Sequence, residues 1–137
     1  MRHLLREARR TDIEVDSAGT GRWHVDEPPD ARAIATAKRR GVTMTHLGRQ
    51  FTRADFTRFD LILAVDVPVL RAVQKLADDA DTRARVRLLR SYDRDAGVGA
   101  EVPDPYYGDQ AAFDQVFDIC MTSCRALLAA LPPPPGA

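Results

Sequence analysis

The stretch Leu61-Ile62-Leu63-Ala64-Val65 is apolar at every position and decides the fold class. A strand with one face in water alternates polar and apolar side chains, so a strand that is apolar throughout is buried on both faces. Such strands are typical of parallel sheets that helices cover on both sides. Asp66 ends the run, and Pro68 suits the first turn of a helix that we expect to reach about Ala77.

Strand-like and helix-like segments alternate along the rest of the chain. Ile13-Glu14-Val15 and Val86-Arg87-Leu88-Leu89 have the composition of strands. We expect helices over residues 1–10, from a cap at Asp30 to about Arg40, at the capping box Thr52–Asp55, and along a C-terminal apolar face from Phe113 to Leu131. This alternation predicts an α/β fold, an open doubly wound parallel sheet with helices on both faces.

Length and composition indicate a single domain. The chain has 137 residues, 45% of them hydrophobic and 29% charged, which is enough to bury a core. We place the domain at residues 1–131 and expect the proline-rich tail, residues 132–137, to be disordered.

Charge and hydropathy exclude two classes of partner. Twenty basic and twenty acidic residues cancel, so nothing favours binding to nucleic acid. The longest apolar run is too short to span a bilayer, and the first residues lack the apolar core of a signal peptide. We therefore expect a cytoplasmic protein with no membrane partner.

A second informative run is Val102-Pro103-Asp104-Pro105-Tyr106-Tyr107-Gly108-Asp109. Each proline fixes its own φ, and the proline after Asp104 drives that aspartate into an extended conformation. The carboxyl group therefore points in one direction beside two phenols, as a general acid requires. A proline-rich surface turn with an incidental aspartate is the alternative interpretation.

Polar residues follow each predicted strand. Asp16 and Ser17 come after the first strand, Asp66 after the second, and the loop that carries Asp104 after the third. Ligands of open α/β sheets lie outside the carboxyl ends of the strands, so these groups are expected to converge on one rim. Asp66 is equally well explained as a simple helix cap.

The segment Asp16-Ser17-Ala18-Gly19-Thr20-Gly21-Arg22-Trp23-His24-Val25 combines small residues with one aromatic. It suits a loop that lets the backbone approach a ligand, although Trp23 alone could simply fill the core. Together with Asp104-Pro105-Tyr106-Tyr107-Gly108 it resembles the low-molecular-weight protein tyrosine phosphatases. The likeness runs from Met1 to about Leu131, and further segments match in order: His46–Thr52, Phe59–Asp66 and Ser91–Asp93.

The resemblance implies a flavodoxin-like, four-stranded sheet and hydrolysis of phosphotyrosine through a cysteinyl-phosphate, with no metal or cofactor. Asp104 would be the general acid that protonates the leaving phenol and later activates water. Trp23, Tyr106 and Tyr107 would wall a slot for the ring of a phosphotyrosine protein or a small aryl phosphate. Behind the site, Ser17 and His46 would hold the phosphate loop in shape, with Asp66 also in this supporting group. His46 also fits a purely structural histidine.

The family carries its nucleophile in a Cys-x5-Arg-Ser loop between its first strand and first helix, and this sequence contains no such motif. Met1–Arg6 resembles the second half of that helix, so we expect the family's first strand to be missing. The amides and arginine of the loop bind the phosphate, and the helix N-terminus lowers the cysteine pKa. Without them the chain as it stands is predicted to be inactive.

The two cysteines do not replace the missing loop. Arg125 follows Cys120 by five positions instead of six, and no glycine lies between them to form a loop. Cys120 and Cys124 share the apolar face of the last helix, where a free cysteine packs as a small hydrophobe. We therefore expect them to be core residues, without a disulfide, a metal or a catalytic role.

Three smaller departures from the family pattern lie near the predicted rim. The family's Met-Asp-x-Ser-Asn is Val65–Val69 here, its Asp-Pro-Arg is Asp30-Ala31-Arg32, and a glycine that often follows Trp-x-Val is Asp26. They bear on the fine positioning of the site.

Two explanations of the missing loop stay open. Either the true start lies upstream and the complete enzyme is an ordinary phosphatase, or the chain is a remnant or pseudophosphatase that binds a partner through its aromatic slot. A flavodoxin-like regulatory or binding domain without chemistry is a further alternative. An arsenate reductase fits less well, because those enzymes also need the absent loop.

Overall fold

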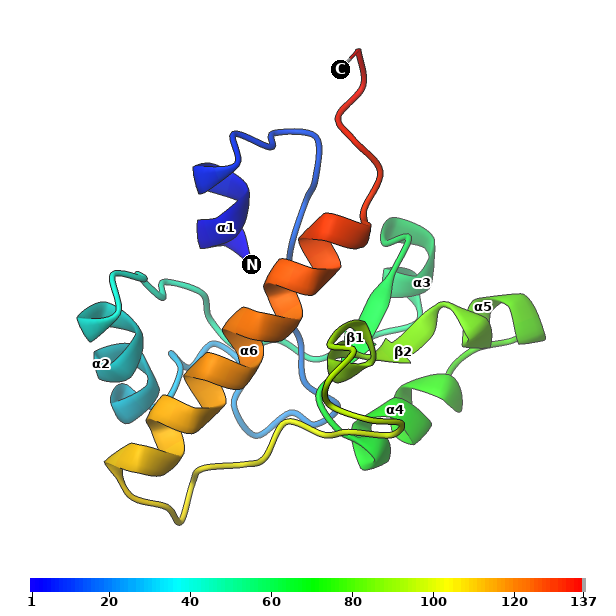
Figure 1. Ribbon diagram of the computed structural model, residues 1–137. Coiled ribbons are helices and arrows are strands. Elements are labelled where there is room, and N and C mark those ends of the chain that lie inside the picture. The colour runs from blue at the N-terminus through cyan, green and yellow to red at the C-terminus, as the bar shows by residue number, and fades with distance from the viewer. Residues whose placement is uncertain (137) are drawn as a thin grey trace.

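The structure is a computed structural model that describes residues 1–136 (Figure 1). In chain order the elements are α1 (Arg2–Glu7), α2 (Ala31–Arg39), α3 (Ala54–Arg58), β1 (Ile62–Ala64), α4 (Val67–Gln74), α5 (Ala80–Ala84), β2 (Val86–Leu88), the 3-10 helix η1 (Leu89–Tyr92) and α6 (Gln110–Ala130). Helices and strands alternate in the middle of the chain, as predicted.

The predicted strand is present as the shorter β1, which pairs in parallel with β2 so that Ala64 lies opposite Leu88. The predicted burial on both faces is only partial, because Ile62 and Leu63 are half-buried and Val65 is 44% exposed. Ala64 is 1% exposed, as expected for a strand without a polar face. Helix α4 packs on both strands and α5 packs on β2. The core beside the sheet consists of Phe56, Val73, Ala77 and Val86.

The strand predicted at Ile13–Val15 is wrong. This segment belongs to no strand, and the sheet within residues 1–136 has two strands instead of four. The carbonyl of Val15 accepts hydrogen bonds from the Arg2 guanidinium, at 3.2 and 2.9 Å, where a strand would offer a ladder bond. A strand needs a neighbour to satisfy its backbone groups, and residue composition cannot supply one.

Aspartates begin four of the helices by accepting a backbone N–H in the first turn. Asp30, the predicted cap, accepts from Arg32 at 2.8 Å, and Asp66, for which a cap was the alternative explanation, accepts from Val69 at 2.9 Å. Asp79 and Asp109 cap α5 and α6 in the same way. The capping box at the start of α3 is half formed, because the Asp55 carboxylate accepts the Thr52 amide at 2.8 Å.

Helix α6 runs through the middle of the molecule (Figure 1). It packs on η1, α2 and α1, and its apolar face buries Phe113 and Leu127. No helix of residues 1–136 combines the length and the apolar character that crossing a membrane would need. The boundary at residue 131 and the disordered tail stay predictions, and Ala137 lies outside the described residues.

Candidate active site

The acid loop, residues 101–109, is fastened at its start to the carboxyl end of β1. Val102 donates its N–H to the carbonyl of Val65 at 2.8 Å. The Glu101 carboxylate accepts the Val67 amide at 2.8 Å, and the Glu101 carbonyl accepts from Arg90 at 2.8 Å. The loop therefore starts at the end of the sheet where ligands of α/β folds bind.

Asp104 lies exposed in this loop and is oriented by its own backbone. Its Oδ1 accepts the N–H of Tyr106 at 3.0 Å, a local turn that aspartate favours. The ring of Tyr106 meets that of Tyr107 edge to face, with centroids 4.9 Å apart. Tyr107 is 97% exposed, so a carboxyl group and two accessible phenol rings share one short segment.

Arg32, in the first turn of α2, connects this loop to two helices. Its guanidinium donates to the Tyr106 carbonyl at 3.0 Å and to Asp30 at 2.7 Å. The Cζ atom lies 4.6 Å from the centroid of Phe113 and 5.4 Å from that of Tyr106. Sequence reasoning noted Arg32 only within the altered Asp-Pro-Arg motif and missed these contacts.

A second polar cluster joins Asp16 to Arg49 and Asp55, two residues that lie six positions apart and far from Asp16 in the sequence. Arg49 forms a two-bond ion pair with Asp55, at 2.9 and 3.1 Å, and its Nε donates to Asp16 at 2.9 Å. Burial disfavours the charged form of Asp55, but the hydrogen bonds from Arg49 and from the Thr52 amide outweigh it and lower the Asp55 pKa. The resemblance places Arg49 in a segment that matches the family, but the sequence alone gives this residue no role and no partners.

The same cluster fixes the loop that carries Ser17. Gly19 donates its N–H to the Arg49 carbonyl at 2.8 Å, and Phe51 donates to the Gly19 carbonyl at 2.7 Å. Burial by itself would raise the Asp16 pKa. The hydrogen bonds from the Ser17 amide and from Arg49 lower the pKa by more than burial raises it, so the net shift is downward. The charged Asp16 carboxylate is therefore part of the resting structure.

The turn that carries Trp23 packs closely against Gly48. Asp26 donates its N–H to the Gly48 carbonyl, and Gly48 donates to the Glu27 carbonyl, both at 2.8 Å. A Cβ on Gly48 would lie 2.1 Å from the His24 carbonyl oxygen, so only glycine fits. Trp23 itself is 82% exposed, which excludes the alternative that it fills the core.

Asp26 has φ of +63°, in the region that glycine adopts without strain. This is the position where the family often has glycine. We expect Asp26→Gly to stabilise the chain by about 0.5 to 1 kcal/mol, measured by urea unfolding, because the strain outweighs the added freedom of the unfolded chain.

Asp60→Gly is the matched control for Asp26→Gly. Asp60 is also exposed, but its φ is not positive, so this substitution should destabilise the chain by making the unfolded state more flexible. Equal effects of the two substitutions would contradict the assignment of strain to Asp26.

No described hydrogen bond joins the remaining predicted site residues into one cluster. Ser17 is exposed and its amide donates to Asp16, whereas His46 is half-buried and makes no side-chain hydrogen bond within residues 1–136. Asp66 caps α4 and stands between two residues that bind the acid loop, Val65 and Val67. None of the described hydrogen bonds joins Trp23, Ser17 or His46 to the acid loop. The aromatic slot and the supporting roles therefore stay predictions.

The sequence predicts that both cysteines are core residues, whereas the structure leaves them partly exposed. Both are free and half-buried on α6. Burial raises the pKa of the Cys120 thiol, so less thiolate forms at neutral pH. A nucleophile needs the opposite shift.

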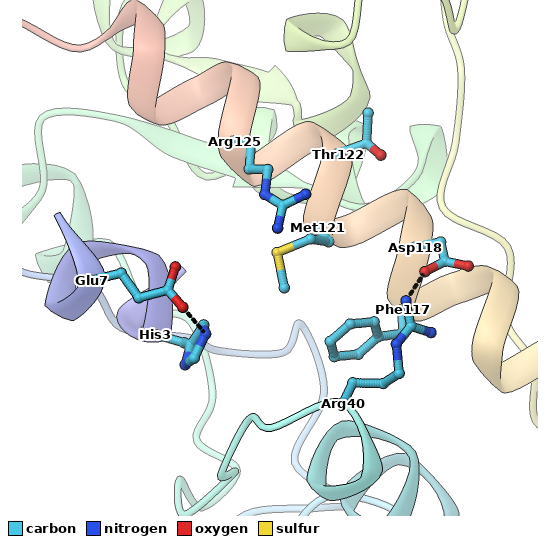
Figure 2. Close-up of a pocket in the computed structure, with 8 residues that line it drawn as sticks. All are labelled: His3, Glu7, Arg40, Phe117, Asp118, Met121, Thr122 and Arg125. Atoms are coloured by element: carbon cyan, nitrogen blue, oxygen red, sulfur yellow. Dashed lines mark hydrogen bonds and ion pairs between the residues drawn. The ribbon is translucent and has the colours of Figure 1, made fainter.

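A cavity of about 420 Å³ lies between α1, the end of α2 and α6, away from the predicted site residues (Figure 2). Most of the charged groups on its wall are paired with one another: His3 with Glu7 at 2.8 Å, and Arg40 with Asp118. Within the described residues, no group of His, Cys, Asp and Glu side chains could hold a metal ion.

Comparison with known proteins gives one family. The family model "Low molecular weight phosphotyrosine protein phosphatase" matches residues 1–133. A low molecular weight protein-tyrosine-phosphatase of Streptomyces coelicolor is 43% identical over 120 residues, which cover 87% of this chain and 73% of the relative. The human low molecular weight phosphotyrosine protein phosphatase is 40% identical over 115 residues, covering 83% and 72%.

Solved structures agree with the sequence comparison. A protein tyrosine phosphatase from Entamoeba histolytica has a TM-score of 0.85 at 26% identity and covers 93% of this chain and 81% of its own. A low molecular weight phosphotyrosine phosphatase from Vibrio cholerae has a TM-score of 0.84 at 27% identity, covering 94% and 82%. The predicted flavodoxin-like α/β fold with a parallel sheet is thereby confirmed.

Proposed function

The chain belongs to the low molecular weight phosphotyrosine protein phosphatase family, and from that premise we propose that it carries the general-acid part of a phosphotyrosine hydrolase. The observation that carries this proposal is the acid loop. It starts at the carboxyl end of β1 and presents the exposed Asp104 carboxyl two residues before the ring of Tyr106. A carboxyl group beside aromatic surface suits a substrate whose leaving group is a phenol.

In the proposed reaction the thiolate of the family's Cys-x5-Arg-Ser loop attacks phosphorus, and the bond between phosphorus and the phenol oxygen breaks. Asp104 gives its proton to that oxygen, so the leaving group departs as a neutral phenol. Asp104 then takes a proton from the water that hydrolyses the cysteinyl-phosphate. Trp23, Tyr106 and Tyr107 would bind the substrate ring, and Ser17, His46 and Asp66 would support the phosphate loop.

We further propose that residues 1–137 do not turn over substrate by themselves. The sequence contains no Cys-x5-Arg-Ser motif, and the raised pKa of Cys120 argues against that thiol as a substitute. General acid catalysis assists the departure of a leaving group but does not replace the nucleophile.

The test uses two proteins. The first is the chain 1–137, from which we expect no release of 4-nitrophenol from 4-nitrophenyl phosphate above the buffer rate. The second, called the extended chain below, has a family member's first strand and Cys-x5-Arg-Ser loop fused ahead of Met1, and should turn over. The extended chain with serine in place of the loop cysteine is the control.

Two results would contradict the proposal. Turnover by chain 1–137 that Asp104→Asn abolishes would show that a nucleophile is present after all. An extended chain that folds, as judged by circular dichroism, but does not turn over would show that the acid loop is not a working half of the site.

A second candidate function is binding of phosphotyrosine peptides without turnover. It is favoured by the exposure of the predicted ring-binding residues, with Trp23 at 82% and Tyr106 at 58%. Fluorescence of Trp23, the single tryptophan, would report such binding during titration with a phosphotyrosine peptide, and the unphosphorylated peptide is the control. We also propose that the partners are phosphotyrosine proteins or small aryl phosphates, and that the protein is cytoplasmic.

A further inference from the structure

Arg32 binds the backbone of the acid loop at Tyr106, the residue whose amide also binds Asp104. Its Nη1 donates to the carbonyl oxygen of Tyr106 at 3.0 Å. The N–H of the same residue, Tyr106, donates to Oδ1 of Asp104 at 3.0 Å. Only the backbone of Tyr106 therefore separates the guanidinium from the carboxyl group of the proposed acid.

The guanidinium is itself held by a carboxylate and an aromatic ring. Asp30 accepts from its Nε at 3.1 Å and from its Nη2 at 2.7 Å, and Asp30 also caps α2 through the Arg32 amide. Below it, the ring of Phe113 lies 4.6 Å from Cζ. The Arg32 side chain is 45% exposed, but pairing and stacking restrict the orientations of its planar cation, and in the structure Nη1 is directed at the loop.

The acid loop is thereby fastened at two points. Its start is bound at Glu101 and Val102 to the end of β1 and the start of α4. Its far side is bound at Tyr106 to Arg32. The prolines on either side of Asp104 stiffen the span between these points, so the second point fixes the direction of the whole span.

We propose that Arg32 is a positioning residue of the acid loop, which orients the Asp104 carboxyl group and the Tyr106 ring toward the leaving phenol through its bond to the Tyr106 carbonyl. This inference rests on the proposed function. It gives a physical reason for an arginine at the third position of the Asp30-Ala31-Arg32 segment. Lysine does not replace it, because the three donors of an ammonium group radiate from one nitrogen, whereas the planar guanidinium reaches Asp30 and the Tyr106 carbonyl from separate nitrogens while it stacks on a ring.

The first measurement uses chain 1–137 itself and needs no activity. Amide hydrogen exchange is followed by NMR in the parent, in Arg32→Ala and in Arg32→Lys. We expect both variants to release the Tyr106 amide, with exchange at least about tenfold faster, because its carbonyl anchor is lost. Amides in the middle of α6 should be unchanged. Arg39→Ala is the matched control, since Arg39 lies on the same helix and pairs with Asp114 instead of the loop.

The second measurement uses the extended chain and compares two substrates. Protonation of the leaving group matters more for phenyl phosphate, whose phenol is a poor leaving group, than for 4-nitrophenyl phosphate. A misdirected acid in Arg32→Ala should therefore lower kcat/KM for phenyl phosphate about tenfold more than for 4-nitrophenyl phosphate. A merely structural role would lower both by the same factor.

The outcomes separate the two proposals. Equal losses on both substrates, or unchanged exchange at Tyr106, would overturn the role of Arg32 while Asp104→Asn still shows the substrate difference. If Asp104→Asn shows no such difference, the proposed function fails, and the exchange at Tyr106 alone decides whether Arg32 fixes the loop. If Arg32→Ala loses helix content, Arg32→Lys, which keeps the charge at the start of α2, provides the comparison.

Discussion

In the extended chain, Asp104→Asn lowers kcat/KM for phenyl phosphate by about 10²- to 10⁴-fold, the range that general acid catalysis contributes. Asparagine keeps the size of the side chain and can still accept the Tyr106 amide, so the loop should keep its shape. It has no acidic proton to give, and the phenol must then leave as its anion. The loss follows from chemistry and not from unfolding.

The measurement is the rate of phenol release from phenyl phosphate, with 4-nitrophenyl phosphate as the second substrate. The loss should be much smaller for 4-nitrophenyl phosphate, because nitrophenolate is stable without protonation. Asp95→Asn is a matched control, since Asp95 is exposed in the adjacent loop and its side chain accepts no described hydrogen bond. An equal loss for the two substrates would remove Asp104 from the role of acid.

The second large effect is on stability. Arg49→Ala leaves the Asp55 carboxylate, 4% exposed, with only the Thr52 amide as a described partner. Removing one member of a buried pair leaves an uncompensated charge, and because Arg49 itself is one-third exposed we expect a loss of about 2 to 4 kcal/mol. Urea unfolding followed by circular dichroism measures it. Arg53→Ala, which breaks the exposed pair with Asp78, should have no measurable effect.

The stability difference should also depend on pH. The Asp55 pKa is lowered in the folded chain, so the stability that the carboxylate contributes is present above its unfolded pKa and is lost as pH falls through the folded one. The parent and Arg49→Ala should therefore differ most near neutral pH, and their unfolding curves should converge once the pH falls below the folded pKa of Asp55. A difference that stays constant down to that pH would show that the ion pair is not its source.

The elements predicted correctly from sequence are those whose cause is local. The buried strand at β1 follows from an apolar run, and the caps at Asp30 and Asp66 follow from one side chain and the amide two or three residues later. The sequence analysis missed α5, a five-residue helix that follows its cap Asp79. None of its residues is buried, so it has no apolar pattern from which a helix could be predicted.

The parts that sequence could not predict depend on distant partners. Ile13–Val15 has strand composition but no neighbouring strand to bond with among the described residues. Arg49 finds Asp16 across 33 positions of sequence, and Arg32 finds the Tyr106 carbonyl across 74. The resemblance was enough to propose exposed site residues such as Asp104 and Trp23. The partners of Arg32 and Arg49, in contrast, are known only from the contacts in the structure.

The course of α6 has a practical consequence for immobilising and labelling the protein. The helix begins at the end of the acid loop and ends at the proline-rich tail, and Figure 1 shows the end of α6 on the opposite side of the molecule from that loop. At 1.5 Å per residue, its 21 residues separate the two ends by about 30 Å. A tether, dye or affinity tag attached at the C-terminus should therefore leave access to Asp104 unobstructed, and single-molecule or surface-based assays can be built from that end.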